Sequence, residues 1–145
     1  MDKSLNHILK KLPYSEPFLF ADSLVSVDEN GIQGKYTFKA DSYFYKGHFV
    51  GNPITPGVIL TECMAQIGLV CLGIYLLGDS LQEELKIALS NTDIDFYLAV
   101  LPGETVTVIS EKEYFRFNKL KCKVKMLNAK GEVVCKGFIS GMLIA

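Results

Sequence analysis

The sequence predicts an α+β fold in which a curved antiparallel sheet of about six strands wraps one long central helix. Two features carry this prediction. The longest apolar run, Val58 to Gly78, has the length of a long helix, and most residues from Lys86 onward alternate between apolar and polar side chains as strands do. Because a helix that is apolar on all sides must be covered by protein, we expect the sheet to fold around it.

The composition fits one domain spanning residues 1–145. Of these 145 residues, 49% are hydrophobic and 21% are charged, so the chain can bury one core and disorder is not expected. The formal net charge of -1, without a basic cluster interleaved with aromatic residues, argues against nucleic-acid binding. Two histidines and four scattered cysteines do not form a spaced ligand set, so we expect no metal site.

The cysteines and the apolar run bear on the cellular compartment. Cys63 and Cys71 would lie roughly 12 Å apart along the predicted helix, too far for a disulfide. No charged-then-apolar signal segment opens the chain, so we expect reduced thiols and a cytoplasmic protein. The apolar run is long enough to span a membrane. Glu62 and Gln66 lie within it without a flanking Lys/Arg bias, which favours a buried core helix.

The chain before the central helix predicts a short helix and a β-hairpin. Residues 4–11 have the pattern of an amphipathic helix. Strand-forming residues then occupy 18–27 and 32–38, on either side of an Asp-Glu-Asn-Gly turn at 28–31. Residues 39–46 look irregular, and we expect the aromatic cluster within them, 43–45, to pack against an apolar surface.

The chain after the helix predicts four strands in an antiparallel meander. An acidic, exposed connector follows Gly78. The strands are expected at 86–100, 104–115, 119–126 and 132–143, with turns at 101–103 and 128–131. The third of these strands alternates strictly. Its apolar face carries Leu120, Cys122, Val124 and Met126, and its other face carries Lys119, Lys121, Lys123 and Lys125.

The start of the central helix has the features of a carbonyl-binding site. Thr55 suits the N-cap position and Pro56 the first helical position, where the missing N–H of proline costs nothing. Gly57 then supplies the first free backbone donor, and its lack of a side chain lets a ligand approach closely. Unpaired N–H groups at the positive end of a helix dipole favour an anion or a polarised carbonyl. The same residues also fit an ordinary capped helix start.

A carboxylate inside the apolar helix is the second unusual feature. Glu62 lies roughly 7.5 Å along the axis from Gly57, and Gln66 is one turn further on the same face, placed to hydrogen-bond the acid. Apolar surroundings should raise the pKa of Glu62 and suit it to proton transfer near neutral pH. A purely structural buried acid, satisfied by Gln66 or a backbone amide, fits the same pattern.

The histidines complete the candidate chemistry. His7 is interpreted as a surface residue of the first helix. His48 lies in the loop before the central helix, and a single histidine there is either structural or catalytic. A histidine, a helix-start donor and a buried acid together suit acid–base chemistry beside a carbonyl. Because one helix should struggle to bring both Gly57 and Glu62 to one small substrate, we expect a homodimer in which a second copy supplies the acid.

Residues 47–66, GHFVGNPITPGVILTECMAQ, resemble the active-site signature of the FabZ-type 3-hydroxyacyl-[acyl carrier protein] dehydratases, which have the hotdog fold. In this segment the histidine lies fourteen residues before the acid. Weaker similarity extends along nearly the whole chain. It includes Leu12-Pro13 and Pro17-Phe18-Leu19 near the start, and the Leu101-Pro102-Gly103-Glu104 turn.

The resemblance implies a role for each residue of the candidate site. His48 would remove the C2 proton of a 3-hydroxyacyl thioester, and Glu62 from the other subunit would protonate the departing hydroxyl. The Gly57 amide would hold the thioester carbonyl, Gln66 would hold Glu62, and Phe49 and Val58 would support the site. The expected product is the trans-2-enoyl thioester, with no metal or organic cofactor. The acyl substrate would be attached to acyl carrier protein or to CoA. The enzyme would be a homodimer or a trimer of such dimers.

The chain departs from the family pattern at two places. Val50 stands where the family usually has proline, and Asp93 to Ala99 replaces a basic Arg-Phe-Lys-Arg-type run near the expected entrance for the carrier protein. The lysine face at 119–125 with Arg116 could dock the carrier instead, or be only a solvated strand face. These departures favour a specialised acyl or polyene pathway over primary fatty-acid synthesis. The alternatives are a hotdog acyl thioesterase, a CoA-dependent hydratase and a non-catalytic acyl-binding subunit.

Overall fold

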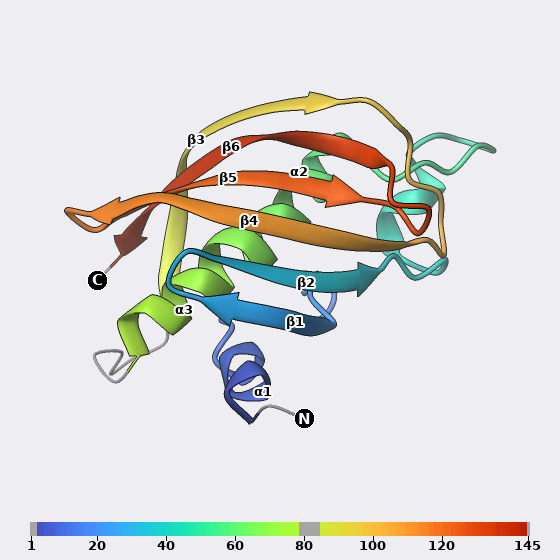
Figure 1. The fold of residues 1–145 in the computed structure, drawn as a ribbon. Coiled ribbons are helices and arrows are strands. Elements are labelled where there is room, and N and C mark those ends of the chain that lie inside the picture. Colours follow the sequence, from blue (N-terminus) through green and yellow to red (C-terminus); the bar gives the residue numbers. More distant parts are fainter. Residues whose placement is uncertain (1–2, 79–84, 145) are drawn as a thin grey trace.

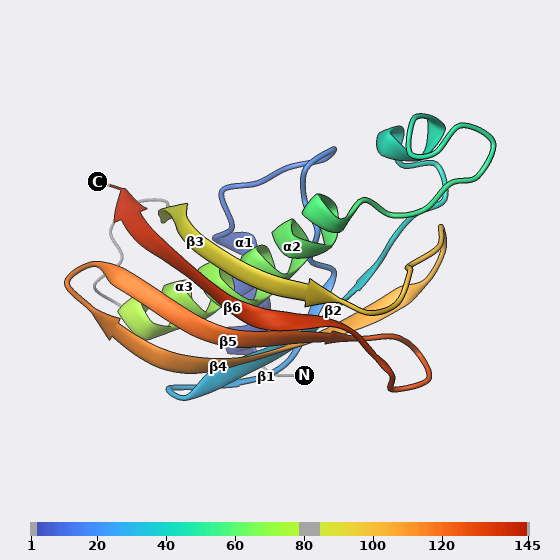
Figure 2. The same ribbon diagram turned by 90° about the horizontal axis from the view of Figure 1, so that it is seen from above.

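The protein is a six-stranded antiparallel sheet curved around one long helix (Figure 1, Figure 2). The computed structural model describes residues 3–78 and 85–144. Neighbouring strands follow the order β1-β2-β4-β5-β6-β3, so β1 and β3 are the two edges of the sheet. Seen from above, the helix lies in the hollow of the sheet, and the loop before it extends beyond the edge strand β3 (Figure 2). The predicted fold class is confirmed.

The elements follow the chain in the expected order. The first part contains α1 (Lys3–Lys10), β1 (Ser23–Asp28), β2 (Gly31–Thr37) and the 3₁₀ turn η1 (Tyr43–Lys46). The central helix consists of α2 (Gly57–Ala65), η2 (Gln66–Cys71) and α3 (Leu72–Leu77). The remaining strands are β3 (Lys86–Phe96), β4 (Thr105–Arg116), β5 (Lys119–Leu127) and β6 (Val133–Ile144).

The central helix is buried along most of its length. It has the length and hydropathy of a membrane span, but 78% of its most apolar window is buried inside the protein. Its middle, η2, is a π-helix that the sequence pattern did not predict, and all six of its residues are buried. The expectation of protein on every side is wrong at two positions, because Val58 is 77% and Tyr75 38% exposed.

Glycines let the helix and the sheet approach closely. A Cβ on Gly68 of the helix would lie 3.0 Å from the Cβ of Ser110 on β4, and one on Gly34 of β2 would lie 2.8 Å from Cγ2 of Ile67. The apolar face of β5 forms part of this contact layer, as predicted, with Leu120, Cys122, Val124 and Met126 all at most 1% exposed. All four cysteines are buried and free.

The order of the last four strands corrects the predicted meander. Only β4, β5 and β6 follow one another as neighbours, and β3 pairs with β6 at the far edge of the sheet. The reason is that β2 occupies the other side of β4, in a register from Gly31 opposite Glu111 to Thr37 opposite Thr105. The chain therefore has to cross from one edge of the sheet to its middle between β3 and β4.

Several predicted bounds also change. β1 begins at Ser23 and not at Phe18, and β3 ends at Phe96 and not at Val100. Beyond β3, the N–H groups of residues 97 and 98 both donate to the carbonyl of Val134, which ends the regular ladder. In the aromatic cluster, residue 45 is buried but Tyr43 is 56% exposed, so the predicted packing is only partly correct. The acidic connector falls on residues 79–84, outside the described residues.

Candidate active site

The helix start differs from the prediction by one residue. Pro56, with ψ of 139°, is the N-cap, and Gly57 is the first helical residue. Thr55 does not cap the helix; its buried hydroxyl is hydrogen-bonded to the hydroxyl of Tyr45 at 2.6 Å. Because proline brings no side-chain acceptor, the first-turn N–H groups of Gly57 and Val58 have no capping side chain. These two amides are therefore available to a ligand at the positive end of the helix.

A groove of about 590 Å³ opens beside this helix start. Two elements line it: α2 contributes Gly57, Val58, Thr61 and Glu62, and β3 contributes Leu89, Thr92, Ile94 and Phe96. The ring of Phe96 packs against the helix start so closely that a Cβ on Gly57 would lie 3.3 Å from Cε1 of the ring. The groove is thus mainly apolar, with one carboxylate and two threonine hydroxyls among its lining residues.

Glu62 is held in this groove by Gln66. The Gln66 Nε2 donates to Glu62 Oε2 at 3.0 Å and to the carbonyl of Phe18 at 3.1 Å, while Gln66 Oε1 accepts from the N–H of Phe20 at 2.7 Å. The Phe20 N–H fixes the amide so that its nitrogen faces the acid. Burial raises the pKa of Glu62, and the bond from Gln66 opposes this rise. The predicted pairing and the direction of the shift are confirmed.

His48 has one ring nitrogen bound and one free to act. Its Nδ1 lies 2.8 Å from the carbonyl oxygen of Ile54, and a carbonyl can only accept. In the neutral imidazole the bond to Ile54 places the proton on Nδ1 and leaves the lone pair of Nε2 for a general base. The ring stacks on Phe49, with centroids 4.1 Å apart and planes at 25°, and Phe49 is itself 53% exposed.

The structure brings some of the predicted site residues together within one chain. Gly57, Val58 and Glu62 of one helix border the same groove. That a second copy supplies the acid beside Gly57 stays a prediction. His48 and Phe49 are not among the described residues that line the groove. The expectation of a shared site now depends on the position of the histidine.

Two further residues near the acid were missed by the sequence reasoning. Burial and, second, the charge of Glu62 raise the pKa of Tyr14 to about 12, which places this phenol in the electrostatic field of the acid. Phe96 faces Gly57 across the groove. No local pattern marks Tyr14. Strand alternation could have identified Phe96 only with knowledge of a β-bulge in β3, because the register shifts between Leu89 and Asn91.

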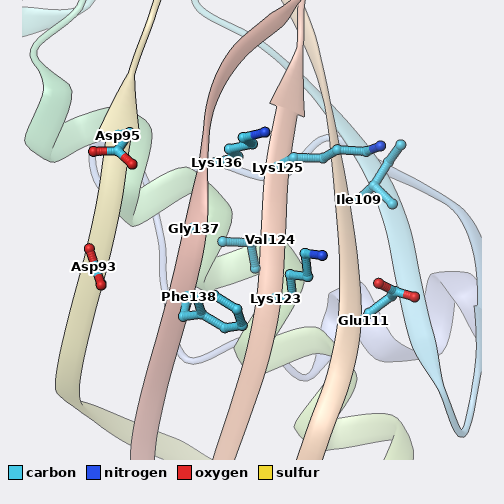
Figure 3. Close-up of a pocket in the computed structure, with 10 residues that line it drawn as sticks. All are labelled: Asp93, Asp95, Ile109, Glu111, Lys123, Val124, Lys125, Lys136, Gly137 and Phe138. Atoms are coloured by element: carbon cyan, nitrogen blue, oxygen red, sulfur yellow. The ribbon is translucent and has the colours of Figure 1, made fainter.

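That bulge decides which side chains of β3 face the groove. An extra residue reverses the alternation, so that Thr92, Ile94 and Phe96 face the helix while Asp93 and Asp95 face outward. The two aspartates border a second hollow, of about 540 Å³, on the outer face of the sheet, together with lysines of β5 and β6 (Figure 3). The acids that replace the expected basic run thus lie on the opposite face of β3 from Glu62.

Sequence comparison with known proteins identifies the family of this chain. The sequence profile of the FabA-like domain matches residues 12–139. The chain belongs to the FabA-like family. Among its relatives, the 3-hydroxyacyl-[acyl-carrier-protein] dehydratase FabZ of Caldicellulosiruptor bescii is 31% identical over 92% of this chain and 94% of the relative. The FabZ protein of Wolbachia pipientis is 32% identical over 92% of each chain. The predicted resemblance to FabZ-type dehydratases is therefore confirmed.

Solved structures confirm the hotdog fold of this FabA-like chain. The dehydratase heterocomplex ApeI:P from Xenorhabdus doucetiae superposes with a TM-score of 0.80 over 95% of this chain and 91% of the other, at 13% identity. A hypothetical thioesterase from Streptococcus pneumoniae, solved with coenzyme A, gives a TM-score of 0.61 over 85% of each chain, at 14% identity. At these identities the similarity shows the shared fold alone.

Proposed function

We propose that this FabZ-type hydro-lyase converts a (3R)-3-hydroxyacyl thioester into the trans-2-enoyl thioester and water. The observation that carries the proposal is the groove bordered both by Glu62, held by Gln66, and by Gly57 with its uncapped amide. Burial raises the pKa of Glu62 and so favours the protonated form that a proton donor requires. The names of the FabZ relatives support the same reaction.

Each group has one task in the proposed reaction. The Gly57 N–H binds the thioester carbonyl and stabilises the charge that develops on its oxygen when C2 loses its proton. His48 Nε2 accepts that proton, and the electron pair of the C2–H bond forms the C2–C3 double bond. The C3–O bond breaks as Glu62 gives its proton to the departing hydroxyl, which leaves as water. The proton on His48 then returns to Glu62 through solvent, which restores the site.

We further propose a homodimer whose sites combine residues of two copies. β3 is an eleven-residue edge strand, and nine of its residues are exposed, Leu89 and Phe96 among them. An exposed strand edge with apolar side chains pairs readily with a second copy. The loop that carries His48 extends beyond β3 (Figure 2), toward the side where that copy would lie. A dimer paired at β3 would thus bring His48 of one copy toward Glu62 of the other.

The acyl group is proposed to arrive on acyl carrier protein in the cytoplasm. The names of the FabZ relatives specify that carrier. Four free buried thiols fit a reducing compartment. The outward lysines of β5 and neighbouring Arg116 form the basic surface that we assign to the carrier, in place of the family's basic run near residue 95. Specialised acyl or polyene synthesis remains the proposed pathway, since the carrier-facing residues differ from the family pattern.

The reaction is tested with purified protein and a 3-hydroxyacyl thioester on carrier protein. Enoyl thioester is the expected product, whereas free thiol without enoyl product would identify a thioesterase. His48→Ala should abolish turnover and leave the dimer intact by gel filtration. A mixed dimer of His48→Ala and Glu62→Gln chains should regain about one working site in two, because one of its two sites contains both native residues. No recovery in the mixed dimer would refute the shared site.

A further inference from the structure

Phe117 is a large apolar side chain placed where the fold gains nothing from it. It occupies the first position of the two-residue turn between β4 and β5, and 89% of it is exposed. Its φ is +52°, and that of Asn118 is +61°. Glycine and asparagine favour such left-handed turn positions, and a bulky side chain there is strained. The hairpin projects beyond the body of the sheet (Figure 1), so the exposed ring is available to another molecule.

The residues around Phe117 give this hairpin tip a positive charge. Arg116 and Lys119 form the last cross-strand pair before the turn, and Lys121 follows on the outward face of β5. The Arg116 guanidinium lies 4.4 Å from the centre of the Tyr114 ring, which holds it beside the tip. Within residues 3–78 and 85–144 the salt bridges involve Lys39, and none involves Arg116, Lys119 or Lys121. Aromatic residues and arginine are enriched at protein–protein interfaces, so this exposed ring with basic neighbours suits an acidic partner.

The register of the sheet places the tip relative to a neighbouring active site. The hairpin lies at the end of β3 that begins with Lys86, since Lys119 pairs with Met142 and Met142 pairs with Ala88. The groove runs along β3 from Leu89 to Phe96, and Phe96, at the other end of the strand, faces Gly57. Two copies paired symmetrically through β3 run antiparallel. The tip of one copy then lies at the same end of the joined sheet as Phe96 and Gly57, which border the groove of the other copy.

The separation across the joined sheet is short. β5 of the second copy would be three strand spacings from β3 of the first, or roughly 14 Å. We propose that Phe117 is the apolar anchor by which the acidic carrier protein docks, with the hairpin tip of one copy receiving the carrier that serves the groove of the other. Arg116, Lys119 and Lys121 provide its electrostatic complement. This inference depends on the proposed carrier-linked dehydration and on the β3-paired dimer.

Phe117→Asn tests the anchor without harming the turn, because asparagine tolerates a left-handed φ better than phenylalanine. The variant should unfold at the same or a higher denaturant concentration than the unmodified protein. With a 3-hydroxyacyl group on carrier protein, its kcat/KM should fall about tenfold through KM, as loss of one interface anchor predicts. With the same acyl group on CoA, kcat/KM should not change. Asn118→Gly is the matched control: it alters the turn, keeps Phe117 and should leave both values unchanged.

The possible outcomes separate this inference from the proposed function. If the unmodified protein forms no enoyl product from either thioester, the proposed function fails. If it is active but Phe117→Asn retains full kcat/KM with carrier-bound substrate, the anchor is refuted. An equal loss with the CoA thioester would refute it as well, because the residue would then act on the acyl group or the site. Binding to vesicles with anionic lipids that requires Phe117, with unchanged carrier kinetics, would assign the tip to a lipid surface instead.

Discussion

Replacing Gln66 with Leu should lower the stability of the fold and change the pH dependence of catalysis together. Gln66 is completely buried and makes three hydrogen bonds, which connect Glu62 to the backbone of Phe18 and Phe20. Leucine has a similar volume but provides neither donor nor acceptor. The substitution therefore removes the bonds without leaving a large cavity, which isolates their contribution from that of packing.

The size of the effect follows from the groups that lose their partners. The Phe20 N–H is buried, and leaving it unsatisfied costs about 1–3 kcal/mol. Losing the bond to a charged Glu62 adds a similar amount, about 1.5–3 kcal/mol, reduced because the acid is partly exposed. The Phe18 carbonyl also loses its bond to Gln66, but this bond is only partly buried. We expect the free energy of unfolding to fall by about 2–4 kcal/mol.

Urea unfolding measures the stability change, and a pH profile of kcat/KM measures the effect on the acid. Since Gln66 opposes the rise in the pKa of Glu62, its removal should raise that pKa further and move the alkaline limb of the profile to higher pH. Ser110→Ala is the control, because it removes the buried bond from Ser110 Oγ to the Gly68 carbonyl at 2.9 Å without touching Glu62 or Gln66. If Gln66→Leu destabilises no more than this control and leaves the profile unchanged, the reasoning is wrong.

Two further predictions concern the groove. Burial raises the pKa of Glu62, so between its unfolded and folded pKa values the native chain binds more protons, and its stability falls as pH rises through that range. Glu62→Gln should abolish both the activity and this decrease in stability with rising pH. If the denaturant midpoint of Glu62→Gln changes between pH 5 and pH 8 by as much as that of the unmodified protein, the prediction is wrong. Gly57→Ala should destabilise the fold by about 1 kcal/mol, because its Cβ would meet the Phe96 ring at 3.3 Å. Adding Phe96→Leu should restore the stability but not the activity, measured against the Phe96→Leu single variant; recovery of activity would show that Gly57 serves packing and not the substrate.

Features that depend on neighbouring residues could be predicted from the sequence. The turn after β1 forms as expected, with Asp28 Oδ1 accepting from the N–H groups of Asn30 at 2.7 Å and Gly31 at 3.0 Å. The alternation of β5 places every predicted apolar residue inward. Glu62 and Gln66 meet because they are four residues apart on one helix. In each case the geometry of a single element determines the contact.

Features that depend on distant segments could not be predicted. The position of β3 beside β6 depends on which strand occupies each edge of β4, and no local pattern carries that information. The bulge between Leu89 and Asn91 exchanges the side chains of β3 that face the helix with those that face outward. A single extra residue cannot be recognised in this strand from the order of its apolar and polar residues. The one-residue error at Thr55 has a similar origin, because the hydroxyl of Tyr45 engages its side chain.

The sequence by itself determined the long apolar helix, the acid within it, the amide partner one turn away and the histidine loop before it. Spacing along one chain sets these relations. Only the tertiary structure decided that Gln66 would be oriented by the backbone of Phe18 and Phe20, 48 and 46 residues away, and that Phe96 would face Gly57 across the groove. Those contacts arise when the sheet closes around the helix, and burial in that core is what raises the pKa of Glu62.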